Sequence, residues 1–224
     1  MSSTIRRRGG AGAEDPLVTT KDLRRAGFPF RSGALCLDFV GTLAKRGMGD
    51  RELLGGPAEL AVWLRAAGLP PTSTPLTDQH VARAREFRES IHELARCRVA
   101  GRALPRRLIN LVNDTAQVDP PPVLLGRDGE SLVPPGALSF EAVLSIIARD
   151  AISLFGGPHG HHIRVCLGHD CSLYFVDRSR PGSRRWCVMA ACGEKASSAT
   201  YRRRHASAVA GGAERPDPVP AAGA

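Results

Sequence analysis

Four of the six cysteines in this chain lie close together near its C-terminal end. They form two pairs, each with four residues between its members, and fifteen residues separate the pairs: Cys166, Cys171, Cys187 and Cys192. This spacing is typical of a tetrahedral zinc site. Four thiolates fill the coordination sphere and leave no position for water or substrate. We therefore expect one structural Zn²⁺ per chain, which would supply most of the folding energy of a module too small for its own core.

Other uses of these cysteines are open at this stage. Two disulfides or a redox pair are the alternatives, although redox motifs normally have two residues between their cysteines. Nearby histidines could replace a ligand: His159, His161, His162 and His169. His169 lies between the first two cysteines, and we interpret it as a neighbour of the site or a surface residue. The two remaining cysteines, Cys36 and Cys97, lie in apolar segments and are interpreted as buried free thiols.

Positive charge is concentrated in the same region. The chain carries a net charge of +9, and the segment 164–204 holds nine basic residues against three acidic ones. Clustered arginine on a zinc-held scaffold indicates an anionic partner, and DNA is the first expectation. The candidate nucleic-acid contacts are Arg178, Arg180, Arg184, Arg185, Lys195, Arg202, Arg203 and Arg204. Trp186 and Tyr201 could stack on bases, but we expect them to be buried beside the zinc site.

The cysteine region resembles the CGNR zinc finger. The resemblance rests on the four cysteines and on three further segments: Asp177–Ser179, Arg184–Cys187 and Tyr201–Arg204. The family is named for the four residues at its last cysteine, and this chain departs from them. Glu194 and Lys195 stand where the family has Asn and Arg. Lysine keeps a cation but lacks the bidentate fork of arginine. The resemblance implies a DNA-binding finger whose contacts at these two positions differ from the family's.

The upstream region resembles the ABATE domain, which precedes this finger in bacterial proteins. The motif Gly33–Val40 is similar to the opening of that domain, and Leu60–Leu64 to its next helix. The family tends to have asparagine where this chain has Gly41. Together the two resemblances imply a bacterial transcription regulator that responds to stress.

Hydrophobic periodicity predicts a mostly α fold for the region that must position the finger. The expected helices run from Pro57 to Gly68, from Thr77 to Gly101, from Pro105 to Ala116 and from Phe140 to Phe155. The apolar run Leu35–Val40 is either a strand or a buried helix. A small hairpin is expected from Val123–Leu125 and Ser131–Val133, which flank a glycine turn.

The helix expected from Thr77 has two distinct faces. Its inward positions are Val81, Ala84, Phe87, Ile91, Leu94 and Ala95. Its outward positions are Arg83, Arg85, Arg88 and Glu89.

The expected organisation is a basic disordered tail (1–20), a helical sensing or dimerisation domain (21–157), a treble-clef-like four-cysteine finger (160–205) and a second disordered tail (206–224). No run of 18 apolar residues occurs, so a cytoplasmic protein without a membrane span is expected. The upstream domain is the natural place for a small-molecule effector site or a homodimer contact.

Catalysis is not expected. His92 and Glu93 lack the second histidine of a metalloprotease helix, and no phosphate-binding glycine loop or nucleophile elbow occurs. The sequence therefore predicts a zinc-dependent DNA-binding transcription regulator. The alternative is a zinc-stabilised adaptor that docks a protein or RNA.

Overall fold

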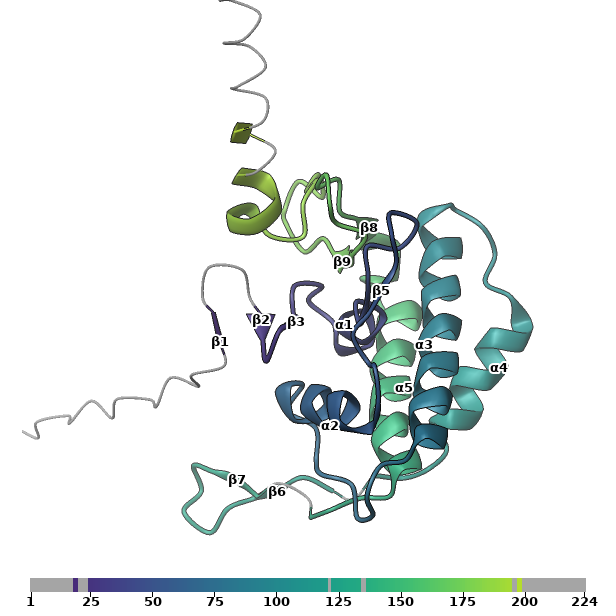
Figure 1. The fold of residues 1–224 in the computed structure, drawn as a ribbon, viewed down its shortest axis with the longest axis vertical. Helices are drawn as coiled ribbons and strands as arrows, with labels where there is room; N and C mark the ends of the chain where they lie inside the picture. The colour runs from purple at the N-terminus through teal and green to yellow at the C-terminus, as the bar shows by residue number, and fades with distance from the viewer. Residues whose placement is uncertain (1–17, 20–23, 121, 134–135, 195–196, 199–224) are drawn as a thin grey trace, which may run out of the picture.

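The computed structural model describes residues 18–19, 24–120, 122–133, 136–194 and 197–198. Helices dominate this part of the chain, which confirms the expected mostly α fold (Figure 1). They are α1 (Leu35–Val40), α2 (Pro57–Ala66), α3 (Asp78–Val99), α4 (Arg106–Thr115) and α5 (Phe140–Gly156). None of the described helices is both long and apolar enough to cross a bilayer.

Short antiparallel strands connect and border the helices. Their bounds are β1 (Val18–Thr19), β2 (Arg24–Arg25), β3 (Phe28–Pro29), β4 (Leu43–Ala44), β5 (Arg51–Glu52), β6 (Leu124–Leu125), β7 (Leu132–Val133), β8 (Ile163–Val165) and β9 (Tyr174–Val176). The first three form one sheet in the order β1-β2-β3, and the others pair as β4-β5, β6-β7 and β8-β9. The expected hairpin is thus confirmed as β6-β7. Strand β1 lies within the segment 1–20, and the remainder of the two expected tails lies outside the described residues.

The apolar run Leu35–Val40, for which the sequence allowed either a strand or a helix, forms the helix α1. Its first turn is fixed by Asp150 of α5, whose Oδ2 accepts a hydrogen bond from the backbone N–H of Cys36 at 2.8 Å. A carboxylate at a helix N-terminus satisfies an otherwise unpaired N–H and interacts favourably with the helix dipole. Both Cys36 and Cys97 are buried free cysteines, as expected.

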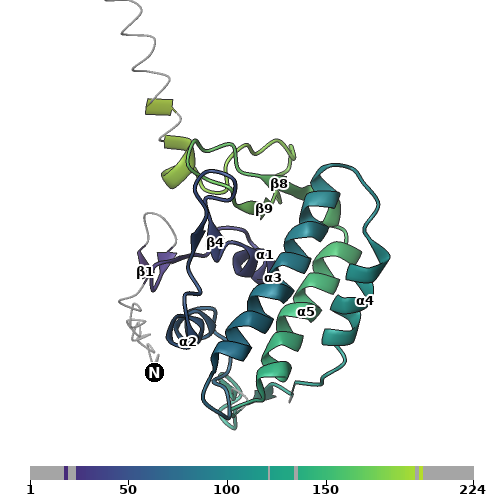
Figure 2. The same ribbon diagram turned by 45° about the vertical axis from the view of Figure 1, so that its right-hand side comes forward.

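The main core forms where the long helices lie side by side. Helices α3, α4 and α5 form one layer, and α1 packs against α3 and α5 (Figure 2). Phe39 of α1 is the centre of an aromatic group, with its ring centroid 5.1 Å from that of Trp63 and 6.4 Å from that of Phe87. All three side chains are fully buried. These three aromatic side chains therefore join α1, α2 and α3 in the core.

Helix α3 begins at the expected residue and buries the expected face, but one of its arginines is not on the surface. Thr77 caps the helix by accepting a hydrogen bond from the His80 N–H, and the six predicted inward positions are all buried. The prediction that Arg88 faces solvent is wrong, because this residue is 2% exposed. Its guanidinium forms a bidentate ion pair with Glu52, with N···O distances of 2.6 and 2.7 Å, and a further bond of 2.8 Å to Glu89. Paired carboxylates compensate the loss of hydration that burial of this charge requires.

We expect Glu52→Gln to destabilise the protein by about 1–3 kcal/mol, because an amide cannot accept both guanidinium bonds and the buried charge loses one counter-ion. Burial alone would raise the pKa of Glu52, but the Arg88 hydrogen bonds outweigh it and hold the pKa below its ordinary value. The pair therefore contributes stability above the unfolded-state pKa and loses it as the pH falls through the folded-state pKa. Urea unfolding at neutral pH measures the effect. Glu86→Gln is the control, since that side chain is 71% exposed; an equal loss in both variants would contradict the assignment.

The hairpin β8-β9 follows the glycines that end α5, yet its side chains enter the main core. Ile163, Tyr174 and Val176 are buried in the same cluster as the helices, and the Val176 N–H donates a 2.8 Å hydrogen bond to the Ser32 carbonyl. The finger is thus anchored to the helical lobe, which we define as residues 24–157. Gly41 permits a second close approach: a Cβ atom at this position would lie 2.7 Å from Leu173 Cδ2. The absence of a side chain at Gly41 therefore lets Leu173 of the finger pack closely against the end of α1.

Candidate metal centre and basic surface

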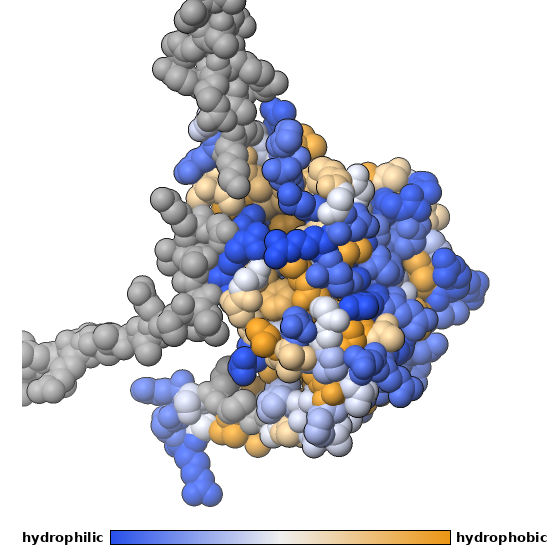
Figure 3. All heavy atoms as spheres, viewed as in Figure 1, coloured by the Kyte–Doolittle hydropathy of each residue, from blue (hydrophilic) through white to orange (hydrophobic). Residues whose placement is uncertain are grey.

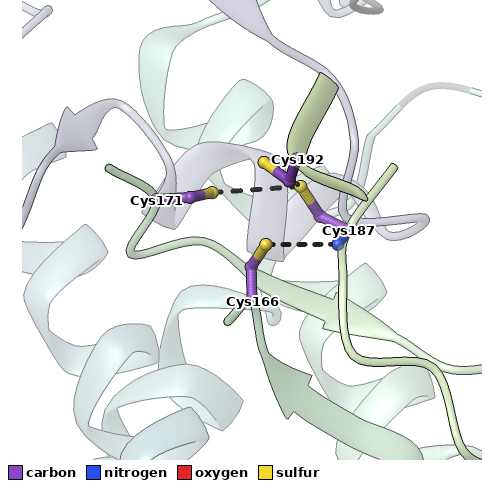
Figure 4. A group of neighbouring side chains, drawn as sticks. All are labelled: Cys166, Cys171, Cys187 and Cys192. Atoms are coloured by element: carbon purple, nitrogen blue, oxygen red, sulfur yellow. Dashed lines mark hydrogen bonds between the residues drawn. The ribbon is translucent and has the colours of Figure 1, made fainter. Parts of the chain in front are cut away.

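Each of the four clustered cysteines comes from a different turn of the finger. Cys166 directly follows β8, Cys171 precedes β9, Cys187 follows the loop after β9, and Cys192 lies in the π-helical turn Met189–Gly193. Their side chains converge on one point (Figure 4). All four sulfur atoms lie within 4.8 Å of one another, with 3.9 Å between Cys171 and Cys187 and 3.7 Å between Cys187 and Cys192.

These distances fit a zinc ion and do not fit disulfides. Sulfurs placed about 2.3 Å from a central zinc form a tetrahedron with edges of about 3.8 Å, whereas a disulfide needs sulfurs about 2.0 Å apart. The six cysteines are all unpaired in this structure. A closed set of four sulfurs makes the zinc structural, because no ligand position is left for a reacting molecule.

The surrounding backbone supports negatively charged sulfur. The N–H groups of Gly168 and Cys187 donate hydrogen bonds to Cys166 Sγ at 3.4 and 3.3 Å. A Cβ atom at Gly168 would lie 3.0 Å from Cys192 Sγ, closer than most Cβ contacts, so a side chain there would crowd the cluster. Hydrogen bonds from Cys171 and Cys187 lower the pKa of Cys166, while the contact with Cys166 raises the pKa of Cys171 and of Cys187. Four thiolates this close repel one another, and a divalent cation at their centre removes that repulsion.

The histidines do not take part in the cluster. His169 projects into solvent with its side chain 98% exposed, in agreement with its interpretation as a surface residue. Among the described residues, the group that could hold a metal ion consists of the four cysteines alone.

A buried aspartate organises the arginine-rich loop beside the metal centre. We define this loop, residues 177–185, as the arginine loop. Asp177 is fully buried, and its Oδ1 accepts hydrogen bonds from the N–H of Ser179 at 3.0 Å and from the hydroxyl of Ser179 at 2.6 Å. Its Oδ2 accepts the backbone N–H of Arg184 at 2.8 Å. One carboxylate therefore closes the loop at both ends, a role that the sequence analysis did not assign. The Asp-x-Ser pattern, which is typical of an Asx turn, was the available signal.

The candidate DNA-contacting residues divide into three groups. Arg178, Arg180 and Arg185 are exposed on the arginine loop. Arg184 has a packing role as well: its guanidinium lies 5.1 Å from the centre of the Phe175 ring and donates a 2.5 Å hydrogen bond to the Cys187 carbonyl. The remaining candidates lie outside the described residues: Lys195, Arg202, Arg203 and Arg204.

Of the two aromatic side chains near the basic residues, Trp186 is described. It is half-buried against the small core of the finger, and the Arg185 guanidinium carbon lies 5.4 Å from the centre of its ring. Tyr201 lies outside the described residues. Trp186, Arg184 and Arg185 line a shallow hollow of about 320 Å³ together with the exposed Met189.

We expect Asp177→Asn to lower the free energy of unfolding by about 1–3 kcal/mol, because the amide NH₂ faces N–H donors and leaves at least one of them unpaired. Burial acts to raise the pKa of Asp177, but the bonds from Ser179 and Arg184 prevail and hold it below the ordinary value. The difference in unfolding free energy between the variant and the wild type should therefore be largest above about pH 4. It should shrink as the pH falls through the folded-state pKa of Asp177. Urea midpoints of the zinc-loaded protein at several pH values measure this. Asp170→Asn, an exposed acid of the same finger, should leave the midpoint unchanged; a pH-independent loss for Asp177→Asn would count against this account.

Comparison with protein families agrees with this architecture. Residues 33–158 match the ABATE model, described as "Putative stress-induced transcription regulator", and residues 162–205 match the CGNR zinc finger. These are regulatory and zinc-finger families, not families of enzymes. A search of curated proteins found no match. Since the ABATE model covers more than half of the chain and the cysteine geometry fits one structural zinc, the chain belongs to the ABATE family and is a zinc-binding regulator with a C-terminal CGNR finger.

Proposed function

We propose that the chain regulates transcription by binding DNA through the arginine loop of its zinc finger. The observation that carries this proposal is the placement of Arg178, Arg180 and Arg185 on one loop that Asp177 closes beside the zinc site. A loop fixed at both ends holds its cations in place before binding, so less entropy is lost when they meet phosphate. Arginine suits this partner because its planar guanidinium matches two phosphate oxygens.

The zinc has a structural part in this function. It fixes the turns on both sides of the arginine loop, since Cys171 precedes β9 and Cys187 follows the loop. We further propose phosphate contacts by Lys195 and the run Arg202–Arg204, which lie outside the described residues. Neighbouring arginines in a run point in different directions and serve phosphates better than a single base edge.

Binding of the zinc-loaded full chain to a labelled random-sequence duplex tests the proposal. Fluorescence anisotropy should give an affinity that falls by about tenfold or more between about 50 and 200 mM salt, because each neutralised phosphate releases condensed counterions. Protein stripped of zinc by a chelator should lose this binding.

The competing function is that of an adaptor that docks a protein. The hollow beside Trp186 and Met189 favours it, because Met189 is 58% exposed. An absence of duplex binding, or an affinity for the duplex that does not respond to salt, would overturn the DNA proposal and favour the adaptor.

A further inference from the structure

A groove of about 640 Å³ lies between the finger and the helical lobe. Its volume is in the range of small-molecule sites, about 300–1,000 Å³. The lobe side is lined by Arg24, Pro29, Arg31, Ala44, Lys45, Arg51 and Leu53. The finger side is lined by Gly168–Leu173 and Ala190–Cys192, which include two of the zinc ligands.

The lobe side of this groove is strongly cationic. It contributes four basic side chains, and Asp170 is the acid among the described lining residues. Lys45 and Arg51 are exposed, and within the described part of the chain neither forms an ion pair with a carboxylate. Figure 3 shows a band of hydrophilic side chains across the middle of the molecule, below the finger, with hydrophobic surface beside it. Exposed cations such as Lys45 and Arg51 in a concave site attract and orient an anion.

Part of the lining of the groove is apolar, which distinguishes it from a purely phosphate-binding surface. Pro29, Leu173 and Ala191 are buried lining residues, and Leu53 is a half-buried one. Contacts to the DNA backbone are made mainly by charged and polar groups. A lining that combines cations with apolar side chains instead matches a small molecule with an acidic group on an apolar body.

The backbone that carries Lys45 is unusual and is tied to the finger. Lys45 has a φ of +55°, a left-handed conformation that is unfavourable for a residue with a side chain and that persists where the surrounding structure enforces it. The next residue, Arg46, donates its N–H to the Ser172 hydroxyl of the finger at 2.9 Å. A ligand that engages Lys45 therefore acts on a turn that holds the finger.

We propose that this groove binds a small amphipathic organic anion, and that its occupancy changes the affinity of the finger for DNA. The anionic group lies against Lys45 and Arg51, and the apolar body rests on Leu53 and Leu173. Because the ligand touches both the lobe and the turns that carry zinc ligands, any change in finger position that favours the ligand also changes DNA affinity, and the coupling is reciprocal. The binding step is independent of the proposed function, whereas the regulatory step rests on it.

The binding step is tested with 8-anilinonaphthalene-1-sulfonate, an amphipathic sulfonate that fluoresces in apolar sites. The zinc-loaded full chain should bind it saturably, and Lys45→Gln/Arg51→Gln should weaken binding by about tenfold or more, the loss expected for charge-assisted contacts. Arg65→Gln/Arg127→Gln, which removes two exposed positive charges outside the groove, is the matched control. Zinc content and circular dichroism show that the variants are folded.

Benzoate should displace the dye, and the neutral benzamide, which has nearly the same shape, should not. Three results would overturn the site: no saturable dye binding, equal binding by the double variant and the control, or equal displacement by benzamide. Dye held by an apolar surface elsewhere on the chain would produce the second result.

The regulatory step is tested by repeating the duplex titration with saturating dye. The duplex affinity of the wild type should change several-fold, and that of Lys45→Gln/Arg51→Gln should not change. An unaltered wild-type affinity would overturn the regulatory step. A double variant whose duplex affinity and salt dependence fall without dye would show that the groove is part of the DNA surface and not an effector site. If no duplex binding occurs at all, the proposed function fails while the dye measurements still decide the groove.

Discussion

Replacing Cys187 by alanine is expected to abolish stoichiometric zinc binding and, with it, any DNA binding by the finger. Cys187 is 1% exposed and lies at the centre of the small finger core, in contact with the sulfurs of Cys171 and Cys192. Structural zinc in modules of this kind is worth about 10–16 kcal/mol of folding free energy. The remaining contacts of so small a core cannot replace it.

The helical lobe should survive this change in a weakened form. Most of the main core is supplied by α1–α5, so far-ultraviolet circular dichroism should retain most of the helical signal. The melting temperature should nevertheless fall by about 5 °C or more, because Ile163, Tyr174 and Val176 join the finger to that core. A metal assay and a thermal melt, run side by side, measure both effects.

Cys97→Ala is the matched control, since Cys97 is also a buried free cysteine but belongs to α3 and lies outside the metal cluster. It should retain one zinc per chain. Normal zinc content in Cys187→Ala would refute the four-cysteine site. A complete loss of helicity would show that the lobe cannot fold without the finger.

The double substitution Arg178→Gln/Arg180→Gln is expected to weaken duplex binding at low salt without loss of zinc. Both side chains are exposed on the arginine loop, and the hydrogen bonds that close this loop are accepted by Asp177 from Ser179 and the Arg184 backbone. If each contacts one phosphate, the slope of log affinity against log salt should fall by about 1.8, since each contact contributes about 0.9. Anisotropy titrations at several salt concentrations give the slope directly.

Two controls separate this effect from misfolding and from bulk charge. Arg65→Gln and Arg127→Gln remove the same charge from exposed positions on α2 and on the β6-β7 turn, and together they should change the slope little. Arg184 is avoided because its guanidinium bonds to the Cys187 carbonyl and its replacement would disturb the loop itself. Equal slopes for the arginine-loop variant and the control pair would remove the loop from the DNA interface.

The amino-acid sequence was sufficient for the features that depend on local spacing. The bounds of α2, α3, α4 and α5 follow from periodic apolar residues and from end signals such as Pro57 and Thr77, which act within a few residues. The zinc site could be predicted from the spacing of the cysteines in the sequence, because two close pairs of cysteines are typical of a tetrahedral zinc site. The run Leu35–Val40 stayed ambiguous, because a run of six residues, five of them apolar, fits a strand as well as a helix.

Features that depend on partners distant in the chain were decided only by tertiary structure. Arg88 shares the helical phase of the buried positions Ala84 and Ile91, but only the tertiary structure shows that Glu52, on a separate strand, pairs with its buried charge. The groove exists because the segments around Lys45 and Ser172 are brought together by folding. Residue type and spacing fix the chemistry that a side chain can perform. Packing decides whether that side chain faces water, an opposite charge or a groove, because burial and pairing are properties of the whole folded chain.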